Sequence, residues 1–301
     1  MFELIFLGTS GSVPSPERNQ SGLLIAAAGQ RILIDCGEGT QRQLLRSGAG
    51  FRRLRRILLT HAHLDHILGL PGLLATMGLH GRSERLSLMA GPQTLQLVTA
   101  FLAGLWGEGR APVTLELSQL APGAVVSEEE FTVECFPVQH GNTDSLGYTF
   151  QARPRRHLRS DILSELGIPD GPVRKRLADG LPIELADGRS IDPEVVLGPL
   201  VPGAKLVVVG DAGSTSGLAE IVQGADALVI EATYLDRDSA IARSHDHLTA
   251  AQAATLAAEA GVKRLILNHI SGRYPAEEIL AEAREIFPAA VVASDMERIA
   301  I

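Results

Sequence analysis

One seven-residue stretch decides how this sequence is interpreted: Thr60-His61-Ala62-His63-Leu64-Asp65-His66. It begins at the last residue of 56–60, an apolar segment of the kind that forms a buried β-strand. If the backbone stays extended, His61, His63 and Asp65 project to one side and His66 points elsewhere. Imidazole and carboxylate groups suit zinc or a similar ion, and one ion accepts about four ligands. The stretch therefore predicts two neighbouring metal ions.

Further candidate ligands stand where other apolar segments end: His140, Asp211 and His269. His247 occupies a comparable loop position. Functional groups of α/β proteins gather at the carboxyl ends of strands, so this shared placement favours a common site. We assign the remaining histidines to surface or structural positions: His80, His157 and His245.

Short apolar segments alternate with helical patterns along the chain. We predict strands at residues 2–7, 31–34, 56–60, 86–89, 131–136, 147–151, 205–209, 227–230, 263–267 and 290–293. Helices are predicted at 71–79, 92–105, 249–260 and 275–286. This mixture indicates a layered α/β fold in one catalytic domain, residues 1–301. Residues 158–202, rich in Asp-Gly turns, are interpreted as an arm inserted in that domain.

Composition describes an ordinary globular chain. It has 301 residues, of which 45% are hydrophobic and 21% charged, so disorder is excluded as the main state. Two cysteines are too few for a disulfide scaffold. We find neither a secretory signal nor an apolar stretch of about 20 residues, and we expect a cytoplasmic protein with no membrane partner.

The formal net charge of −8, taken alone, argues against a nucleic-acid partner. Positive charge is nevertheless clustered, at 52–56, at 153–159 and at 174–176. Lysine and arginine contacts to phosphates give affinity that does not depend on base sequence. The clusters therefore leave open an RNA partner that is recognised by shape.

The residues quoted above resemble the ligand pattern of the metallo-β-lactamase superfamily. That resemblance implies an αββα sandwich with a two-metal site on one edge. Further motifs resemble the ribonuclease Z family: Phe6-Leu7-Gly8-Thr9, Asp35-Cys36-Gly37-Glu38-Gly39-Thr40, Gly69-Leu70-Pro71-Gly72-Leu73-Leu74, Glu231-Ala232-Thr233, His247-Leu248-Thr249 and Asn268-His269-Ile270-Ser271-Gly272-Arg273-Tyr274. The inserted segment resembles the flexible exosite arm of that family.

The resemblance assigns metal ligands. One ion would be held by His61, His63 and His140. The second would be held by Asp65, His66 and His269. Asp211 would bridge the two ions, which would be two Zn²⁺ per subunit, although these ligand types also accept Mn²⁺.

The resemblance also assigns catalytic and binding roles. Asp65 would accept a proton, and His247, steadied by Glu231, would protonate the leaving 3′-oxygen. The substrate would be precursor tRNA, cut to a tRNA 3′-OH and a trailer with a 5′-phosphate. The arm would contact tRNA through Gly171, Pro172, Arg174, Lys175 and Arg176. A loop carrying Arg18 and Asn19 would meet the CCA end. Family members are homodimers in which one subunit's arm serves the other's active site, and we expect no DNA partner.

Three positions depart from the family pattern: Ile230 replaces a histidine, Leu248 a serine, and Pro16 a lysine. The first two bear on how substrate is oriented, and the third on where the enzyme cuts relative to CCA. Two alternatives stay open: a general metal-dependent phosphodiesterase, and a non-catalytic RNA-binding protein with a structural zinc site.

Overall fold

The computed structural model describes residues 2–81 and 85–301. Met1, at the start of the segment in which we found no secretory signal, lies outside the described residues. The chain divides into two compact units. One runs to Gln151 and resumes over Ala204–Ile301; the other is Ala152–Gly203.

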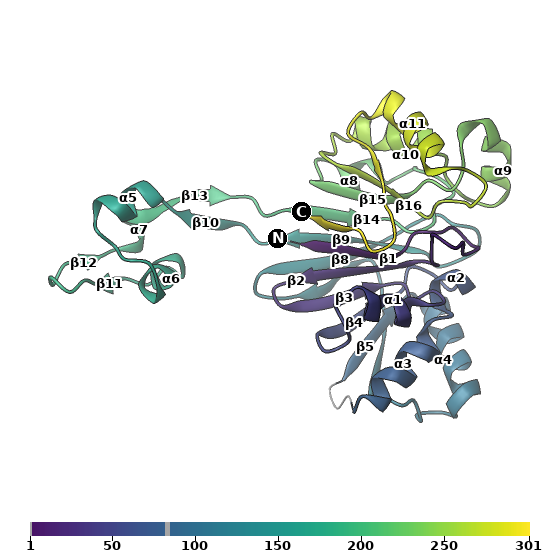
Figure 1. Cartoon of the computed structure of the whole chain (residues 1–301), viewed down its shortest axis with the longest axis horizontal. Helices are drawn as coiled ribbons and strands as arrows, with labels where there is room; N and C mark the ends of the chain where they lie inside the picture. Colours follow the sequence, from purple (N-terminus) through teal and green to yellow (C-terminus); the bar gives the residue numbers. More distant parts are fainter. Residues whose placement is uncertain (1, 82–84) are drawn as a thin grey trace. The chain divides into compact units, whose positions relative to one another are not determined.

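The larger unit contains two seven-stranded sheets (Figure 1). The strands of the first sheet are, in spatial order, β18 (Arg298–Ala300), β1 (Glu3–Gly8), β2 (Gly22–Ala27), β3 (Gln30–Ile34), β4 (Leu54–Leu58), β5 (Leu86–Ala90) and β6 (Leu115–Gln119). Those of the second are β17 (Val291–Val292), β16 (Leu265–Asn268), β15 (Ala227–Glu231), β14 (Lys205–Val208), β9 (Leu146–Ala152), β8 (Phe131–Pro137) and β7 (Gly123–Ser127).

Helices cover the outer face of each sheet. Beside the first sheet lie α1 (Thr40–Arg46), α3 (Leu70–Leu79) and α4 (Pro92–Trp106), whose apolar side chains share a core cluster with β3, β4 and β5. Beside the second lie α8 (Ala219–Val222), α10 (Ala250–Glu259) and α11 (Ala276–Ile286). A 3₁₀ turn, η1 (Asp236–Asp238), and α9 (Ser239–Ser244) precede α10. The predicted αββα sandwich is confirmed (Figure 1).

Apolar side chains also join the two sheets to each other. The ring of Phe2, just before β1, meets Phe131 of β8 edge-on at 6.1 Å and Phe150 of β9 at 5.9 Å. Burial on both faces explains why β14 is apolar after Lys205 and why β15 is apolar up to Glu231.

Parallel pairing brings the ends of several strands to one edge. Strands β3 to β6 are parallel in the first sheet, and β14 to β17 in the second. The two edges touch beyond β4 and β14, where a Cβ atom on Gly210 would lie only 3.0 Å from Thr60 Cγ2. This close approach brings together the loops that carry the candidate ligands.

The smaller unit has its own core. Its elements are β10 (Arg155–Leu158), α5 (Ser160–Glu165), α6 (Pro172–Ala178), β11 (Ile183–Glu184), β12 (Ser190–Ile191), α7 (Pro193–Val196) and β13 (Leu197–Val201). Strands β10 and β13 pair antiparallel. Leu163, Leu177, Ile183 and Val196 are among the side chains buried together. Among the described residues, no helix of either unit is long and apolar enough to cross a membrane.

Candidate metal centre

The seven-residue stretch changes conformation in its middle. His63 has extended backbone angles, φ −64° and ψ 149°, but the short helix α2 (Leu64–Ile67) begins at the next residue. The expectation of an extended backbone is therefore wrong beyond His63. Because a helix turns by about 100° per residue, Asp65 does not share the side of His61 and His63. It lies instead with His66.

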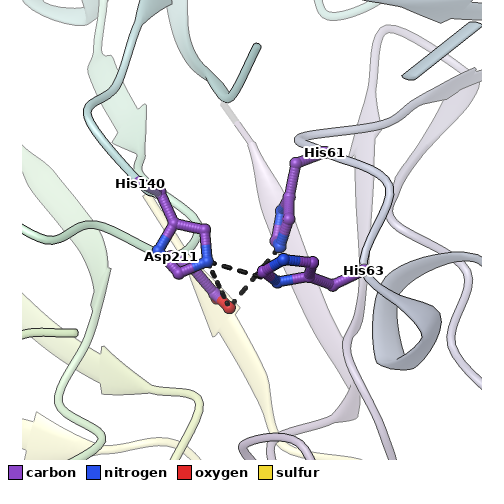
Figure 2. Close-up of side chains that lie close together, drawn as sticks. All are labelled: His61, His63, His140 and Asp211. Atoms are coloured by element: carbon purple, nitrogen blue, oxygen red, sulfur yellow. Dashed lines mark hydrogen bonds and ion pairs between the residues drawn. The ribbon is translucent and has the colours of Figure 1, made fainter. Parts of the chain in front are cut away.

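The first group of candidate ligands consists of His61, His63, His140 and Asp211, whose ligand atoms all lie within 4.8 Å of one another. Figure 2 shows the three imidazoles converging on the Asp211 carboxylate. Asp211 Oδ2 is 3.7 Å from His61 Nε2 and 3.8 Å from His140 Nε2. His140 Nε2 is 3.2 Å from His63 Nδ1. The geometry suits one cation between these atoms.

The second group consists of Asp65, His66, His269 and the same Asp211. Asp211 Oδ2 lies 3.3 Å from His66 Nε2 and 3.2 Å from His269 Nε2. Asp65 Oδ2 lies 3.5 Å from His66 Nε2 and 3.7 Å from His269 Nε2. Since Asp211 belongs to both groups, it stands where a bridging ligand would stand.

Several ligand atoms are buried without a hydrogen-bond partner among the described residues. They are Nε2 of His61, His66 and His269, and Oδ1 of Asp211. Buried polar atoms in native proteins are almost always paired, because leaving them unpaired costs free energy. Cations coordinated by these atoms would remove that cost. The residues therefore fit the metal ions that the sequence predicts.

Outer partners orient the second group. His66 Nδ1 lies 2.8 Å from Asp35 Oδ2. Asp35 also accepts hydrogen bonds from the Thr60 amide at 2.8 Å and the Thr60 hydroxyl at 2.9 Å. His269 Nδ1 lies 3.0 Å from Ser21 Oγ. Such contacts fix which imidazole nitrogen faces the metal. Asp35 stands in one of the motifs quoted above, and its position directly after β3 is the signal in the sequence that points to this role.

The first group is held in the same way. His140 Nδ1 lies 2.6 Å from the carbonyl oxygen of Asp246, and Thr60 Oγ1 lies 3.0 Å from His61 Nδ1. Both imidazoles thus present Nε2 toward Asp211. The partner of His140 comes from a distant loop, which sequence spacing does not reveal.

Electrostatics favour an ionised Asp211 carboxylate among these imidazoles. Burial lowers the pKa of His66, but Asp211 and Asp35 outweigh it and raise that pKa well above its usual value. Burial lowers the pKa of His61 well below its usual value, and nearby His66 lowers it further. Burial raises the pKa of Asp211, but His269 and His66 outweigh it and hold that pKa well below its usual range. Asp211 therefore stays charged, as a ligand shared by two cations requires.

Glu231 and His247 form a pair beside the metal ligands. His247 Nδ1 is 2.9 Å from Glu231 Oε1. Glu231 is further held by the Ala212 amide at 2.6 Å and the Thr233 hydroxyl at 2.5 Å. Burial lowers the pKa of His247, but the Glu231 carboxylate outweighs this and raises the pKa to about 9. His247 is therefore protonated at neutral pH.

Two departures from the family pattern are explained by packing. Ile230 is fully buried in the core of the second sheet, on a strand face that does not hold Glu231. Leu248 is also buried, and its backbone N–H donates to Glu231 Oε2 at 3.2 Å. Neither side chain disturbs the Glu231–His247 contact.

Arg18 and Asn19 make hydrogen bonds within the protein. Arg18 Nη1 donates to Thr9 Oγ1 at 2.6 Å and to the Ala293 carbonyl at 2.7 Å. Asn19 Nδ2 donates to the Glu38 carbonyl at 2.7 Å. Both side chains thus shape the loop in which they lie.

The basic residues of the arm differ in their contacts with the rest of the protein. Arg174 pairs with Asp170 at 2.6 Å and donates to the Ile168 carbonyl at 2.8 Å. Lys175 and Arg176 are exposed on α6, which begins with Pro172 after Gly171. The smaller unit, residues 152–203, carries eight Lys and Arg and eight Asp and Glu, so it has no net charge and its positive charge is only local.

The sandwich and the ligand cluster define the class of this protein, a β-lactamase superfamily domain. The sequence profile described as a β-lactamase superfamily domain matches residues 174–270. A second profile, described as the anti-Pycsar protein Apyc1, matches residues 2–164. The structure of human tRNase Z, short form, is similar in fold, with a TM-score of 0.70 and 24% identity over 99% of each chain.

Curated relatives narrow the class to one family. Ribonuclease Z of Bradyrhizobium diazoefficiens is 60% identical over 301 residues, which is 100% of both chains. Ribonuclease Z of Gemmatimonas aurantiaca is 40% identical over 294 residues, covering 96% of this chain and 93% of the relative. The chain belongs to the ribonuclease Z family, and it is a hydrolytic enzyme.

Proposed function

We propose that this enzyme removes the 3′ trailer of precursor tRNA, leaving a tRNA 3′-OH and a trailer with a 5′-phosphate. The observation that carries the proposal is the placement of Asp211 in two adjoining ligand groups within a chain of the ribonuclease Z family. Two cations held by these adjoining groups would suit phosphodiester hydrolysis, in which negative charge develops on several oxygens.

Two Zn²⁺ ions per chain are the proposed cofactor. His61, His63 and His140 would hold one, Asp65, His66 and His269 the other, and Asp211 both. Bound ions supply a hydroxide at neutral pH and neutralise phosphate charge. The same ligands accept Mn²⁺, so metal availability also decides which ion is used.

Three side chains would move or hold protons. Asp65 Oδ2 accepts a hydrogen bond from the Ser12 amide at 3.0 Å, which fixes the carboxylate that would orient the attacking oxygen and accept its proton. His247 is charged at neutral pH and stands within 5.1 Å of His140, ring centre to ring centre. It would donate its proton to the leaving 3′-oxygen, while Glu231 keeps it protonated.

The arm would hold the body of the tRNA. Lys175 and Arg176 are the best candidates for phosphate contacts, since both are exposed and neither forms an ion pair within the described chain. A homodimer in which one arm serves the other active site, a cytoplasmic location and the absence of a DNA partner are parts of the same proposal. Their support is the family resemblance.

The two alternative functions, a general phosphodiesterase and a non-catalytic RNA-binding protein, have less support. Similarity over the whole chain, at 60% identity, to a protein named ribonuclease Z favours an RNA substrate over a general phosphodiester. Membership of a hydrolase family argues against a purely structural zinc site. Cleavage of a 3′-extended tRNA transcript, with end mapping and with or without CCA, tests the proposal. Hydrolysis of bis(p-nitrophenyl) phosphate without cleavage of the transcript would overturn it.

A further inference from the structure

Asp295, near the end of the chain, connects three separate segments. Its Oδ1 accepts a hydrogen bond from the Thr9 hydroxyl at 2.8 Å. Its Oδ2 accepts from the Asn19 amide and from Gln43 Nε2, each at 2.8 Å. Thr9 and Asn19 stand at the two ends of one loop, and Gln43 lies on α1. The carboxylate therefore closes the base of the loop 9–20 and ties it to a helix.

The tail that carries Asp295 is itself firmly attached. The Ala293 amide donates to the Leu267 carbonyl at 2.8 Å, and the Met296 amide donates to the Phe6 carbonyl at 2.7 Å. These bonds join the tail to strands of both sheets. Asp295 is thus a fixed point against which the loop is held.

Arg18 adds to this attachment. Its guanidinium bonds Thr9 Oγ1, the same hydroxyl that donates to Asp295, and also the Ala293 carbonyl. Thr9 therefore accepts from a cation and donates to a carboxylate, an arrangement of charge-assisted hydrogen bonds stronger than neutral ones. The base of the loop depends on the negative charge of Asp295 as well as on its shape.

The far part of the same loop reaches the metal ligands. The Ser12 amide donates to Asp65 Oδ2, the oxygen that faces His66 and His269. The backbone of Ser12 has a left-handed φ of 55°, which a residue other than glycine rarely adopts unless its surroundings impose it. A Cβ atom on Gly11 would lie 2.9 Å from the His269 carbonyl oxygen, so the loop has little room to move there.

We propose that Asp295 is a positioning residue for catalysis: it holds the base of the loop 9–20, and thereby the Ser12 amide that orients Asp65. The proposal rests on the proposed catalytic role of Asp65. No sequence motif pointed to Asp295, which lies 230 positions after Asp65 and meets it only through the loop.

The hydrogen bonds of the Asp295 carboxylate indicate which substitution tests its role. Its two oxygens accept three hydrogen bonds, so Asp295→Asn would turn an NH₂ group toward at least one donor and remove the charge beside Arg18. Asp295→Glu keeps the charge and both acceptors. The matched control is Asp226→Asn: Asp226 is also partly buried, and it accepts from the Lys205 amide and from Lys263 Nζ at 2.7 Å each.

The experiment measures local hydrogen exchange and steady-state hydrolysis of bis(p-nitrophenyl) phosphate on the metal-loaded, full-length protein. For Asp295→Asn we expect faster amide exchange in peptides covering residues 9–20, unchanged exchange in β15, and kcat lowered about 10-fold or more with little change in KM. Asp295→Glu should recover part of kcat, and Asp226→Asn should leave kcat and loop exchange unchanged.

Three results would overturn the proposal: full kcat in Asp295→Asn, unchanged exchange in the loop, or equally faster exchange throughout both sheets. The last would mean a general structural role. Failure of the wild-type enzyme to cut precursor tRNA would count against the proposed substrate only, because the small diester still reports on Asp65 and Asp295.

Discussion

His247 Nδ1 lies 2.9 Å from Glu231 Oε1, and this contact sets the charge of the imidazole. Burial alone would lower the pKa of His247, because a cation loses hydration inside the protein. The neighbouring carboxylate reverses the effect and raises the pKa to about 9. His247 is protonated below that pH and neutral above it, so a step that needs its proton fails on the alkaline side.

For Glu231→Gln, the alkaline limb of precursor-tRNA cleavage should move to lower pH. Without the carboxylate, burial remains and the pKa of His247 falls from about 9 toward or below 6.5. At pH 8, kcat should then fall about 10-fold for each unit by which the pKa has dropped below that pH. Bound cations lower the pKa in both proteins, which leaves the direction of the difference unchanged.

The measurement is a single-turnover pH–rate profile. Hydrolysis of bis(p-nitrophenyl) phosphate should change less, because nitrophenolate leaves without a proton. Glu259→Gln, at an exposed position on α10, is the control. Identical alkaline limbs in Glu231→Gln and the wild type would rule out His247 as the acid that Glu231 keeps charged.

Asp65→Asn should abolish cleavage and spare binding. The amide keeps the shape of the side chain but accepts no proton, so we expect a loss of about 10²–10⁴-fold in single-turnover rate. The affinity for precursor tRNA, measured by filter binding, should stay within about 3-fold because the arm residues are untouched. A variant that still cleaves at the wild-type rate removes Asp65 from the mechanism.

Metal removal should destabilise the protein. Chelation leaves Nε2 of His61, His66 and His269 unpaired around a buried carboxylate. Ligand binding at 100 times the dissociation constant stabilises a fold by about 2.7 kcal/mol, which corresponds to about 4 °C in Tm for a chain of this size. Calorimetry of the apo and reloaded protein measures this difference.

Elemental analysis of the same samples counts the ions. We expect two ions per wild-type chain, a loss of metal in Asp211→Asn, and no loss in His157→Gln, whose imidazole is exposed. Two ions retained by Asp211→Asn, with the Tm of the wild type, would contradict the bridging role.

Replacing both Lys175 and Arg176 by alanine should weaken tRNA binding and spare the chemistry. Each lost phosphate contact reduces the slope of log K against log salt by about 1. We expect KM for precursor tRNA to rise about 10-fold and kcat on bis(p-nitrophenyl) phosphate to stay unchanged. The control replaces Arg52 and Arg53, two exposed arginines of the larger unit. An equal rise in KM from the control would show that the arm has no special part in binding.

Much of the fold was predictable because buried strands leave a strong apolar pattern. Residues 86–89 and 227–230 were placed within one residue of β5 and β15, and 249–260 within one residue of α10. Strand β2 was missed, although it too is buried. Strands β10 to β13 of the smaller unit were also missed, because β11 and β12 have two residues each, β10 has one apolar residue, and most of β13 is exposed. Strands β6, β7 and β18 were missed too.

The candidate ligands could be found in sequence because metal chemistry limits which side chains serve and strand ends limit where they stand. How those ligands divide between two groups could not be derived from residue spacing, and only the family resemblance implied it. The helix α2 turns Asp65 away from His61 and His63, and a local backbone change of this kind leaves no mark in residue spacing.

The sequence by itself determined a layered α/β fold, the ligand types and the inserted segment, because each follows from local pattern or composition, and its resemblance to a known superfamily narrowed the fold to the αββα sandwich. Only the tertiary structure decided which side chains and backbone groups hold the ligands and the loop 9–20 in place. Asp35 beside His66, Asp246 beside His140 and Asp295 beneath the loop 9–20 come together from distant parts of the chain. Their contacts arise because two sheets pack with their strand ends at one edge, and sequence distance carries no record of that packing.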